Sequence, residues 1–229
     1  AARMATRGDG RLSNELRPLV ANSGALNRCD GATRFRLGRT EVVVSVRGPY
    51  EPKRSRQCPD RAILDVVLLP RTGRLGALER EFEHLILRAL HRLIVARHQP
   101  LTFVQVVIQV VLDDGALLSA ALNAACLALA HAGVPLCGLI GAVTLALPPT
   151  GHVILDPTAD EQRSAASVTT LCYLLQYGGQ QAEGPGQLLV AHVQGMLERS
   201  QYEVLAASAQ EAGVAVASLQ RLALQRSTQ

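Results

Sequence analysis

Apolar and polar positions along the chain change period several times, and each change marks a predicted secondary-structure element. Residues 32–37 and 41–46 are short apolar runs joined by a three-residue turn, which predicts a β-hairpin. From Leu78 the apolar residues recur every three or four positions, which predicts an amphipathic helix ending near His98, ahead of Pro100. Further predicted strands are 62–69, 102–112, 141–147, 152–156, 167–177 and 188–194, and further predicted helices are 116–132 and 200–224.

The order of these elements defines a fold class. Strands precede helices in each half, which is typical of an α+β domain with mixed sheets packed with helices in two layers. Residues 11–28 and 158–164 show no period and are expected to be irregular. We expect a single domain over residues 9–226 after a flexible N-terminus of residues 1–8, with a capping box of Ser200 and Glu203 at the last helix.

The composition predicts an aliphatic core and no metal centre. Hydrophobic residues make up 48% of the chain, yet Trp is absent. The five cysteines include no C-x-x-C pair and the six histidines no H-E-x-x-H pattern, so we expect reduced, mostly buried thiols, no metal and no cofactor. No apolar run reaches the roughly 18 residues of a bilayer span, so we expect a soluble intracellular protein with no membrane partner.

Charge is unevenly distributed between the two halves. Residues 1–100 hold eighteen Arg and one Lys against ten acidic residues, a net charge of +9, whereas residues 101–229 have a net charge of −5. A basic first half is compatible with a polyanionic partner such as RNA, or with a solvated basic face.

The sequence DDGALLSAALNAACLAL, residues 113–129, connects a predicted strand to a predicted helix. Unpaired N–H groups at such a helix start attract anions, and a phosphate site usually adds a hydroxyl and an Arg or Lys. Here Gly115 is followed by Ala116 and Leu117, and two carboxylates stand at the mouth of the turn. We therefore expect Asp113 or Asp114 to cap the helix in place of a bound anion.

Four stretches carry a family resemblance: RGDGRLSNELRPL (7–19), GATRFRLGRTEVVVSVRGP (31–49), LDDGALLSAALNAACLALAHAGVPL (112–136) and VILDPT (153–158). In this order they resemble the RNase PH family, and more narrowly the RNase PH-type subunits of the eukaryotic exosome ring. The resemblance extends over residues 7 to about 225. It implies a single RNase PH-like domain with a ribosomal protein S5 domain 2-like fold.

The resemblance also implies that this chain is not an enzyme. Active members are phosphorolytic 3′→5′ exoribonucleases, which hold phosphate with Ser or Thr followed by Arg and use further acidic residues for acid or metal chemistry. Here Asp156 and Glu161 persist and are interpreted as structural. The positions that depart from the active pattern are Ala116, Leu117, Gln162 and Val168, none of which is a cation or an acid.

The implied function is that of a non-catalytic structural subunit of the RNA exosome core ring. Such a subunit helps to form the channel that guides single-stranded RNA for 3′→5′ processing and degradation, including rRNA processing and mRNA turnover. Implied partners are other RNase PH-like ring subunits and cap subunits with S1 or KH modules, and the implied location is nucleus, nucleolus and cytoplasm. The residues predicted to contact RNA phosphates are Lys53, Arg54, Arg56, Arg71, Arg74 and Arg80.

Two other interpretations stay open at this point. The chain is an active phosphorolytic or hydrolytic 3′→5′ exoribonuclease as a homo-oligomer, using displaced residues such as Arg80, Asp160 and Glu161, or it is a stand-alone RNA-binding protein. The first predicts that cleavage depends on Asp160 and Glu161. The second rests on the basic first half alone.

Overall fold

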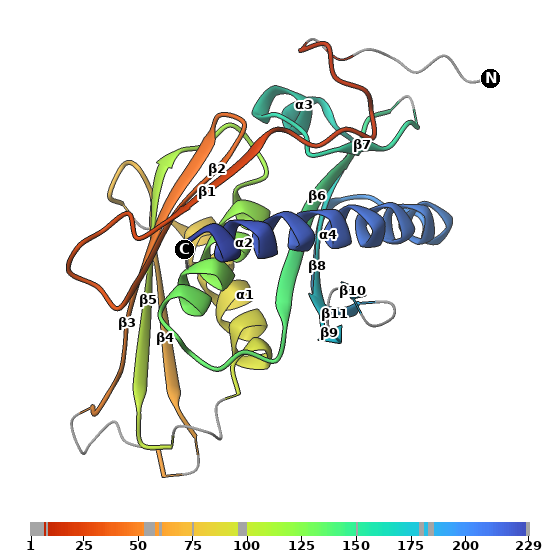
Figure 1. Ribbon diagram of the computed structural model, residues 1–229. Coiled ribbons are helices and arrows are strands. Elements are labelled where there is room, and N and C mark those ends of the chain that lie inside the picture. The colour runs from red at the N-terminus through yellow and green to blue at the C-terminus, as the bar shows by residue number, and fades with distance from the viewer. Residues whose placement is uncertain are drawn as a thin grey trace.

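A computed structural model describes residues 7, 9–52, 58–59, 61–74, 76–95, 100–149, 151–178, 181–182 and 186–227. The first half forms a five-stranded sheet in the order β1-β2-β3-β5-β4 (Figure 1). Its strands are β1 (Leu19–Ser23), β2 (Gly31–Leu37), β3 (Thr40–Tyr50), β4 (Ile63–Leu69) and β5 (Phe103–Leu112). Only the β4–β5 pair is parallel. Helix α1 (Ala77–Leu93) connects these two strands and returns the chain to the end of the sheet where β4 begins, so β5 runs in the same direction as β4. The sheet is therefore mixed, as predicted.

The second half forms an antiparallel four-stranded sheet in the order β11-β8-β6-β7. Its strands are β6 (Leu139–Leu147), β7 (Ile154–Leu155), β8 (Ser167–Leu175) and β11 (Gln187–Gly195). The remaining elements of this half are α3 (Ala159–Ser164) and the two-residue strands β9 (Tyr177–Gly178) and β10 (Gln181–Ala182).

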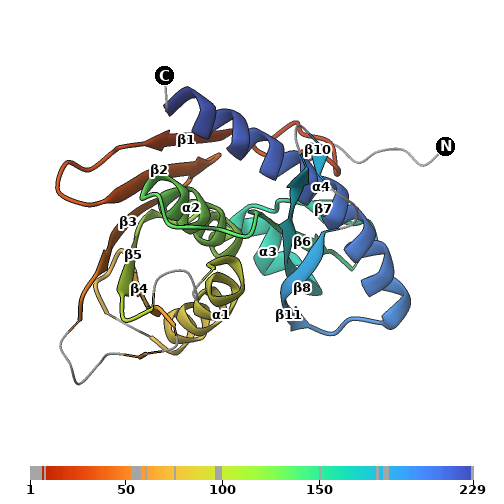
Figure 2. The same cartoon turned by 60° about the horizontal axis from the view of Figure 1, so that its bottom comes forward.

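Helices cover both sheets and confirm the α+β class. Figure 2 shows α1 and α2 (Leu117–His131) between the two sheets, with α4 (Arg199–Ser227) along the other side of the four-stranded sheet. The five-stranded sheet with α1 and α2 makes one sheet-and-helix unit, and the four-stranded sheet with α4 makes the second.

Helix α2 is apolar on all sides because it lies between two sheets. Every residue from Leu118 to Leu129 is buried, and α2 contacts β2 and β3 on one side and β6 and β8 on the other. The larger core surrounds this helix, and a smaller one lies between the four-stranded sheet and α4. Both are aliphatic, as the composition predicts.

The contact between α4 and β6 depends on two glycines. A Cβ added to Gly141 of β6 would lie 2.3 Å from the carbonyl oxygen of Gly213 in α4, which is closer than any real side chain approaches. The helix therefore packs on this strand backbone to backbone at that point.

Several predicted elements differ from the structure in their limits, and three cases are instructive. Helix α1 ends at Leu93 instead of near His98, because Ile94 is extended and forms a β-bridge with Leu136. Residues 96–99 of the predicted helix lie outside the described residues. The predicted irregular segments 11–28 and 158–164 contain the short strand β1 and the six-residue helix α3.

The predicted capping box at the last helix is wrong. Helix α4 begins at Arg199, so Ser200 lies inside it. The Glu198 N–H donates to Oε1 of Gln201 at 3.1 Å, and the Glu203 carboxylate pairs with Arg199 at 3.3 Å.

Three further predictions concern the N-terminal segment, the cysteines and membrane-spanning helices. Of the predicted flexible segment 1–8 the structure describes Arg7 alone, whose side chain is buried, and the domain limits stay a prediction. All five cysteines are free, but only Cys126 and Cys172 are buried, so the expectation of mostly buried thiols is wrong. Within the described ranges, no helix combines the length and hydropathy needed to cross a membrane.

Candidate functional site

The turn between β5 and α2 is where the sequence raised the question of an anion site. Gly115 and Ala116 both adopt positive φ, +87° and +56°, and Ala116 is the N-cap of α2 without a side-chain cap. Oδ1 of Asp113 accepts a hydrogen bond from the Gly115 N–H at 3.0 Å. The expectation that Asp113 or Asp114 caps the helix is therefore wrong, because the Asp113 carboxylate closes the turn one residue earlier.

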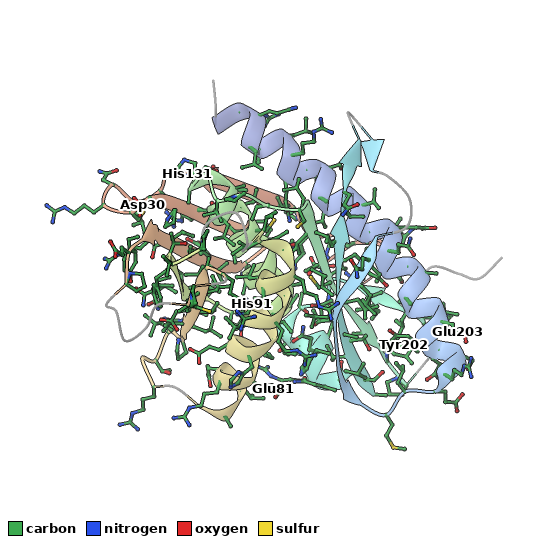
Figure 3. The ribbon with its side chains drawn as sticks, turned by 90° about the horizontal axis from the view of Figure 1, so that it is seen from below. Asp30, Glu81, His91, His131, Tyr202 and Glu203 are labelled. Carbon is green, nitrogen blue, oxygen red and sulfur yellow. The ribbon has the colours of Figure 1, made fainter. Side chains whose placement is uncertain are left out.

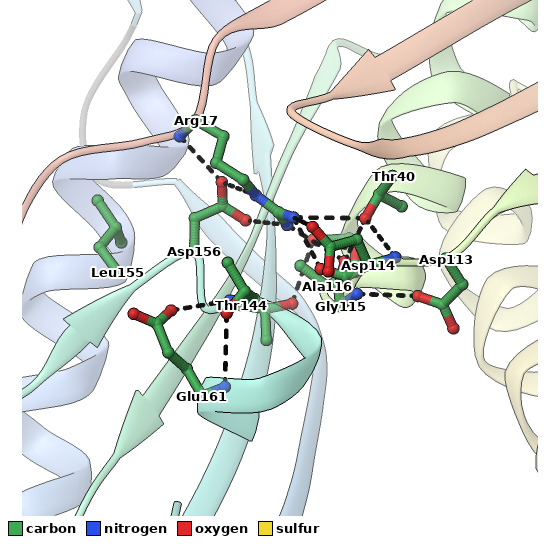
Figure 4. Close-up of polar contacts among 12 residues, drawn as sticks. Arg17, Thr40, Asp113, Asp114, Gly115, Ala116, Thr144, Leu155, Asp156 and Glu161 are labelled. Carbon is green, nitrogen blue, oxygen red and sulfur yellow. Dashed lines mark hydrogen bonds and ion pairs between the residues drawn. The ribbon is translucent and has the colours of Figure 1, made fainter. Parts of the chain in front are cut away.

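Arg17 supplies a cation to this region from the segment that precedes β1. Its Nε and Nη2 donate to the two carboxylate oxygens of Asp156 at 2.8 and 2.7 Å (Figure 4). Its Nη1 donates to the Asp114 carbonyl at 2.8 Å, and Nη2 also donates to the Gly115 carbonyl at 3.2 Å. A guanidinium has five N–H donors, and protein oxygens engage the Arg17 group on every nitrogen.

Protein groups also fill the mouth of the turn. The Thr40 hydroxyl at the start of β3 donates to the Gly115 carbonyl at 2.7 Å and accepts the Asp114 N–H at 3.1 Å. From the other side, the Ala159 N–H donates to the Asp114 carbonyl at 3.1 Å, and a Cβ on Gly115 would lie 2.7 Å from the Pro157 carbonyl oxygen. The entry to α3 therefore packs directly on the backbone where an anion would approach.

The two retained acidic residues both have structural partners. Asp156 is 1% exposed, has a φ of +50°, and donates its N–H to the Thr144 carbonyl at 2.9 Å. The Glu161 carboxylate accepts the Thr158 N–H at 2.8 Å in the capping box of α3 and lies 3.6 Å from Nε of Arg7. Asp156 thus anchors the N-terminal segment, and Glu161 stabilises a helix start.

Arg7 ties the N-terminal segment to the same place. Its guanidinium donates to the Leu155 carbonyl. Burial lowers the pKa of Arg7 below its ordinary value, and the nearby Glu161 carboxylate opposes this effect. Arginine keeps its proton in proteins, so Arg7 remains a cation at neutral pH.

The positions singled out from the sequence lie on both sides of this network. Ala116 is buried, and Leu117, Gln162 and Val168 are half-buried. Among the described residues, no group of three His, Cys, Asp or Glu side chains could hold a metal ion. As it stands, the network can bind segments of the chain together, and its charged groups are mutually neutralised.

The predicted RNA-binding residues lie elsewhere. Arg71 and Arg74 are exposed in the connection between β4 and α1, and Arg80 is exposed in the first turn of α1. Lys53, Arg54 and Arg56 lie outside the described residues. The assignment of these six residues to RNA stays a prediction.

Sequence reasoning missed Arg17 and Thr40, although both lie in stretches that carry the family resemblance. Arg17 stands 139 positions from Asp156, and a pairing over that separation leaves no local pattern. The one available signal was an arginine between Leu16 and Pro18 in a segment without hydrophobic period.

The fold and the order of motifs define a chain of the RNase PH type. The family model described as the 3′ exoribonuclease family, domain 1, matches residues 15–135. The chain belongs to this family.

Within the family, the chain is similar to proteins of the RRP46 type. It is 35% identical over 184 residues to the exosome complex exonuclease RRP46 homolog of Arabidopsis thaliana, covering 78% of this chain and 77% of the relative. It is 32% identical over 168 residues to the exosome complex component RRP46 of Saccharomyces cerevisiae, covering 69% and 75%. The crystal structure of rice Rrp46 superposes with a TM-score of 0.88 at 32% identity, covering 96% of this chain and all of that one.

Proposed function

We propose that this chain is a non-catalytic structural subunit of an RNA exosome core ring. In that role it pairs with other RNase PH-like subunits and helps to form the channel that guides single-stranded RNA for 3′→5′ processing and degradation. The relatives that are 32–35% identical over more than two thirds of the chain are named as exosome complex proteins, which supports ring membership.

The observation that carries the absence of catalysis is the pairing of Arg17 with Asp156. The carboxylate retained from the acidic motif is buried and accepts hydrogen bonds from the guanidinium on both oxygens. Both oxygens of this carboxylate are therefore already hydrogen-bonded within the fold, which supports a structural role for Asp156. The phosphate-holding positions carry Ala116 and Leu117, which provide no cation.

A phosphorolysis assay tests this part of the proposal. We expect the purified chain, incubated with single-stranded RNA, inorganic phosphate and Mg²⁺, to release no nucleoside diphosphates above background. A chain carrying Asp160→Ala and Glu161→Ala is the matched control and is expected to give the same background. Sustained release by the unaltered chain that disappears in this variant would contradict the proposal.

The same assay decides the alternative, an active phosphorolytic or hydrolytic 3′→5′ exoribonuclease as a homo-oligomer. The description of the Arabidopsis relative as an exonuclease favours it. Against it, Asp160 is exposed and pairs with Arg163 at 2.8 Å, while Glu161 caps α3. Cleavage without added phosphate, measured as release of nucleoside monophosphates, would identify the hydrolytic form.

Ring membership is tested by what accompanies the chain in cells. We expect a tagged chain to co-purify with other RNase PH-like subunits and with S1- or KH-containing cap subunits, and to sediment as a large complex. A lone species of 24.4 kDa that carries RNA would instead identify a stand-alone RNA-binding protein. We also propose a location in nucleus, nucleolus and cytoplasm, to be checked by fluorescence microscopy of the tagged chain.

A further inference from the structure

An open polar hollow lies at the opposite end of the five-stranded sheet from the Arg17–Asp156 pair. Its volume is about 510 Å³, and it is formed by the β1–β2 loop, the end of β3 and the start of β5. Its lining residues are Asn27, Arg28, Cys29, Asp30, Arg47, Tyr50 and Gln105. Thr40 contacts the turn of the candidate site and Tyr50 is the last residue of the same strand, so at about 3.3 Å per residue the two lie at most about 33 Å apart.

Tyr50 gives this hollow an aromatic surface. Its side chain is 45% exposed, and its ring packs on Phe103 with centroids 5.3 Å apart and planes tilted by 52°. Phe103 is buried, and the two residues are partners in the β3–β5 pairing, so Tyr50 is held by the sheet. An aromatic ring fixed on one side and open on the other is a surface on which a base of any identity can stack.

Two guanidinium groups accompany this ring. Arg28 comes from the β1–β2 loop and Arg47 from the outer face of β3, and both are exposed. Within the described residues, neither has a hydrogen-bond or ion-pair partner. The one carboxylate of the hollow, Asp30, accepts the Gly48 N–H at 2.7 Å, which ties the β1–β2 loop to β3, and the two guanidinium charges of the hollow outnumber its single negative charge. Cationic donors are therefore left available to a ligand.

The amide of Gln105 completes the polar side of the hollow. It stands opposite Arg47 in the β3–β5 pairing, and its Nε2 donates to Oδ2 of Asp65 at 3.1 Å. This bond uses one of the two N–H donors of the amide and leaves the other N–H and the amide oxygen available. Figure 3 shows Asp30 on the opposite side of the molecule from Tyr202 and Glu203, so the hollow lies away from the N-terminal part of α4.

We infer that Tyr50, Arg28 and Arg47 form a nucleotide-binding subsite for single-stranded RNA. The base stacks on Tyr50, and the flanking phosphates are bound by the two arginines without sequence preference. The chemistry fits because a stacking surface and unpaired forked donors occur together in the basic half of the chain. The predicted RNA-binding residues Lys53, Arg54 and Arg56 follow Tyr50 within six positions. This inference rests on the proposed function, since it assigns part of the RNA path to a defined place on the subunit.

Equilibrium binding of a fluorescent single-stranded RNA to the purified chain tests the subsite. Tyr50→Ala is expected to weaken binding by about 5- to 100-fold, and Tyr50→Phe to stay within about 2-fold of the unaltered chain, because stacking needs the ring and not the hydroxyl. If Tyr50→Ala does not fold, Tyr50→Leu keeps apolar packing on Phe103 without a stacking face and is expected to show the same loss. Affinity that stays within about 2-fold in a folded Ala or Leu variant would overturn the inference.

The arginines have a separate signature in salt dependence. Arg28→Gln with Arg47→Gln is expected to reduce the slope of log affinity against log salt by about 1.4, since each single-strand phosphate contact contributes about 0.7. Arg163→Gln with Arg199→Gln, which removes two charges from exposed positions outside the hollow, is the matched control and is expected to leave the slope unchanged. An equal change in both variants would mean that only overall charge matters, and the subsite would be wrong.

Crosslinking gives the location directly and separates this inference from the proposed function. RNA containing 5-iodouridine is expected to form an adduct on the peptide that contains Tyr50, detected by mass spectrometry. An adduct only elsewhere, or a crosslink from this peptide to a neighbouring protein subunit, would overturn the inference. A Tyr50→Ala chain that still co-purifies with ring subunits shows that ring membership is independent of the subsite. If the unaltered chain does not co-purify with ring subunits, the proposed function is contradicted, while the crosslinking result still decides the RNA subsite.

Discussion

Replacing Arg17 by methionine is expected to lower the free energy of unfolding by about 3 kcal/mol. The substitution keeps most of the aliphatic volume and removes the cation, so the Asp156 carboxylate stays buried without its partner. Removing one member of a buried ion pair typically costs about 3–5 kcal/mol, mainly because the other charge is left uncompensated. In a protein whose total stability is about 5–15 kcal/mol, such a loss is easily measured.

The remaining contacts place the expected loss at the lower end of that range. In the unaltered protein the backbone N–H of Arg17 donates to the Asp156 carboxylate at 3.0 Å, and the variant would keep this bond. Nη1 of Arg11 also lies 4.0 Å from the same carboxylate. The two carbonyls that lose Arg17 keep other donors, Thr40 for Gly115 and an α3 amide for Asp114. With about 2–4 °C per kcal/mol for a chain of this size, Tm is expected to fall by about 6–12 °C.

Urea denaturation of three variants measures this effect. Arg163→Met breaks the exposed pair with Asp160 and is expected to cost less than about 0.5 kcal/mol. The double variant Arg17→Met with Asp156→Asn removes the orphaned charge, and asparagine tolerates the positive φ of that position, so we expect at least half of the loss to be recovered. If Arg17→Met costs no more than Arg163→Met at an unchanged m-value, the Arg17–Asp156 pair does not stabilise the fold, and its assignment as a structural anchor is wrong.

The other predictions concern the same region and the core. Gly115 has a φ of +87°, and a Cβ added there would lie 2.7 Å from the backbone, so Gly115→Ala is expected to lower the free energy of unfolding by more than about 2 kcal/mol. Gly73 has a φ of +70° but faces open space, so Gly73→Ala is expected to cost about 1 kcal/mol. Urea denaturation compares the two variants. Burial raises the pKa of Cys126 to about 12, so its thiol stays protonated and unreactive at pH 8 to 9, while exposed Cys137 is expected to be alkylated by iodoacetamide, as mass spectrometry will show. Thr158→Ala removes the N-cap of α3 and is expected to cost about 1 kcal/mol by thermal denaturation, and a loss below about 0.3 kcal/mol would contradict the role of the capping box.

The hydrophobic period predicted the long elements well because burial decides them. Strands β3 and β5 and helices α1 and α2 have apolar faces long enough to show a period, and each lies within a few residues of its predicted position. β1 has five residues and alternates only between half-buried and exposed positions, so its pattern is weak. α3 has six residues, fewer than two turns, and is specified by its capping box.

The end of α1 shows how tertiary contacts override a local pattern. The apolar period continues through Ile94, yet the Cys137 N–H donates to the Leu93 carbonyl at 2.8 Å and the Val95 N–H to the Pro135 carbonyl at 3.0 Å. These bonds turn the chain into an extended segment along residues 135–137. A sequence-based boundary cannot include partners that lie 40 or more positions away.

The candidate site was located by motif, but its chemistry depends on pairings that the sequence does not display. The stretches 112–136 and 153–158 identify the turn and the acidic segment, and the structure brings the two together. The cation that joins them comes from Arg17, in a segment with no period. Three segments distant in sequence therefore meet at one ion pair, and only the packed fold reveals that they do.

The Arg17–Asp156 ion pair and the proposed nucleotide subsite lie near opposite ends of β3. The ion pair lies near Thr40 and the proposed nucleotide subsite surrounds Tyr50, ten residues and at most about 33 Å along the strand. Substitutions this far apart with no shared partners are usually additive to within about 0.3–0.5 kcal/mol. Arg17→Met is therefore expected to have little effect on RNA affinity, and the loss of RNA affinity caused by Tyr50→Ala is expected to be the same with and without Arg17→Met. Strong coupling between them in either measurement would mean that RNA contact depends on the ion pair, and the division of the sheet into a structural end and a binding end would be wrong.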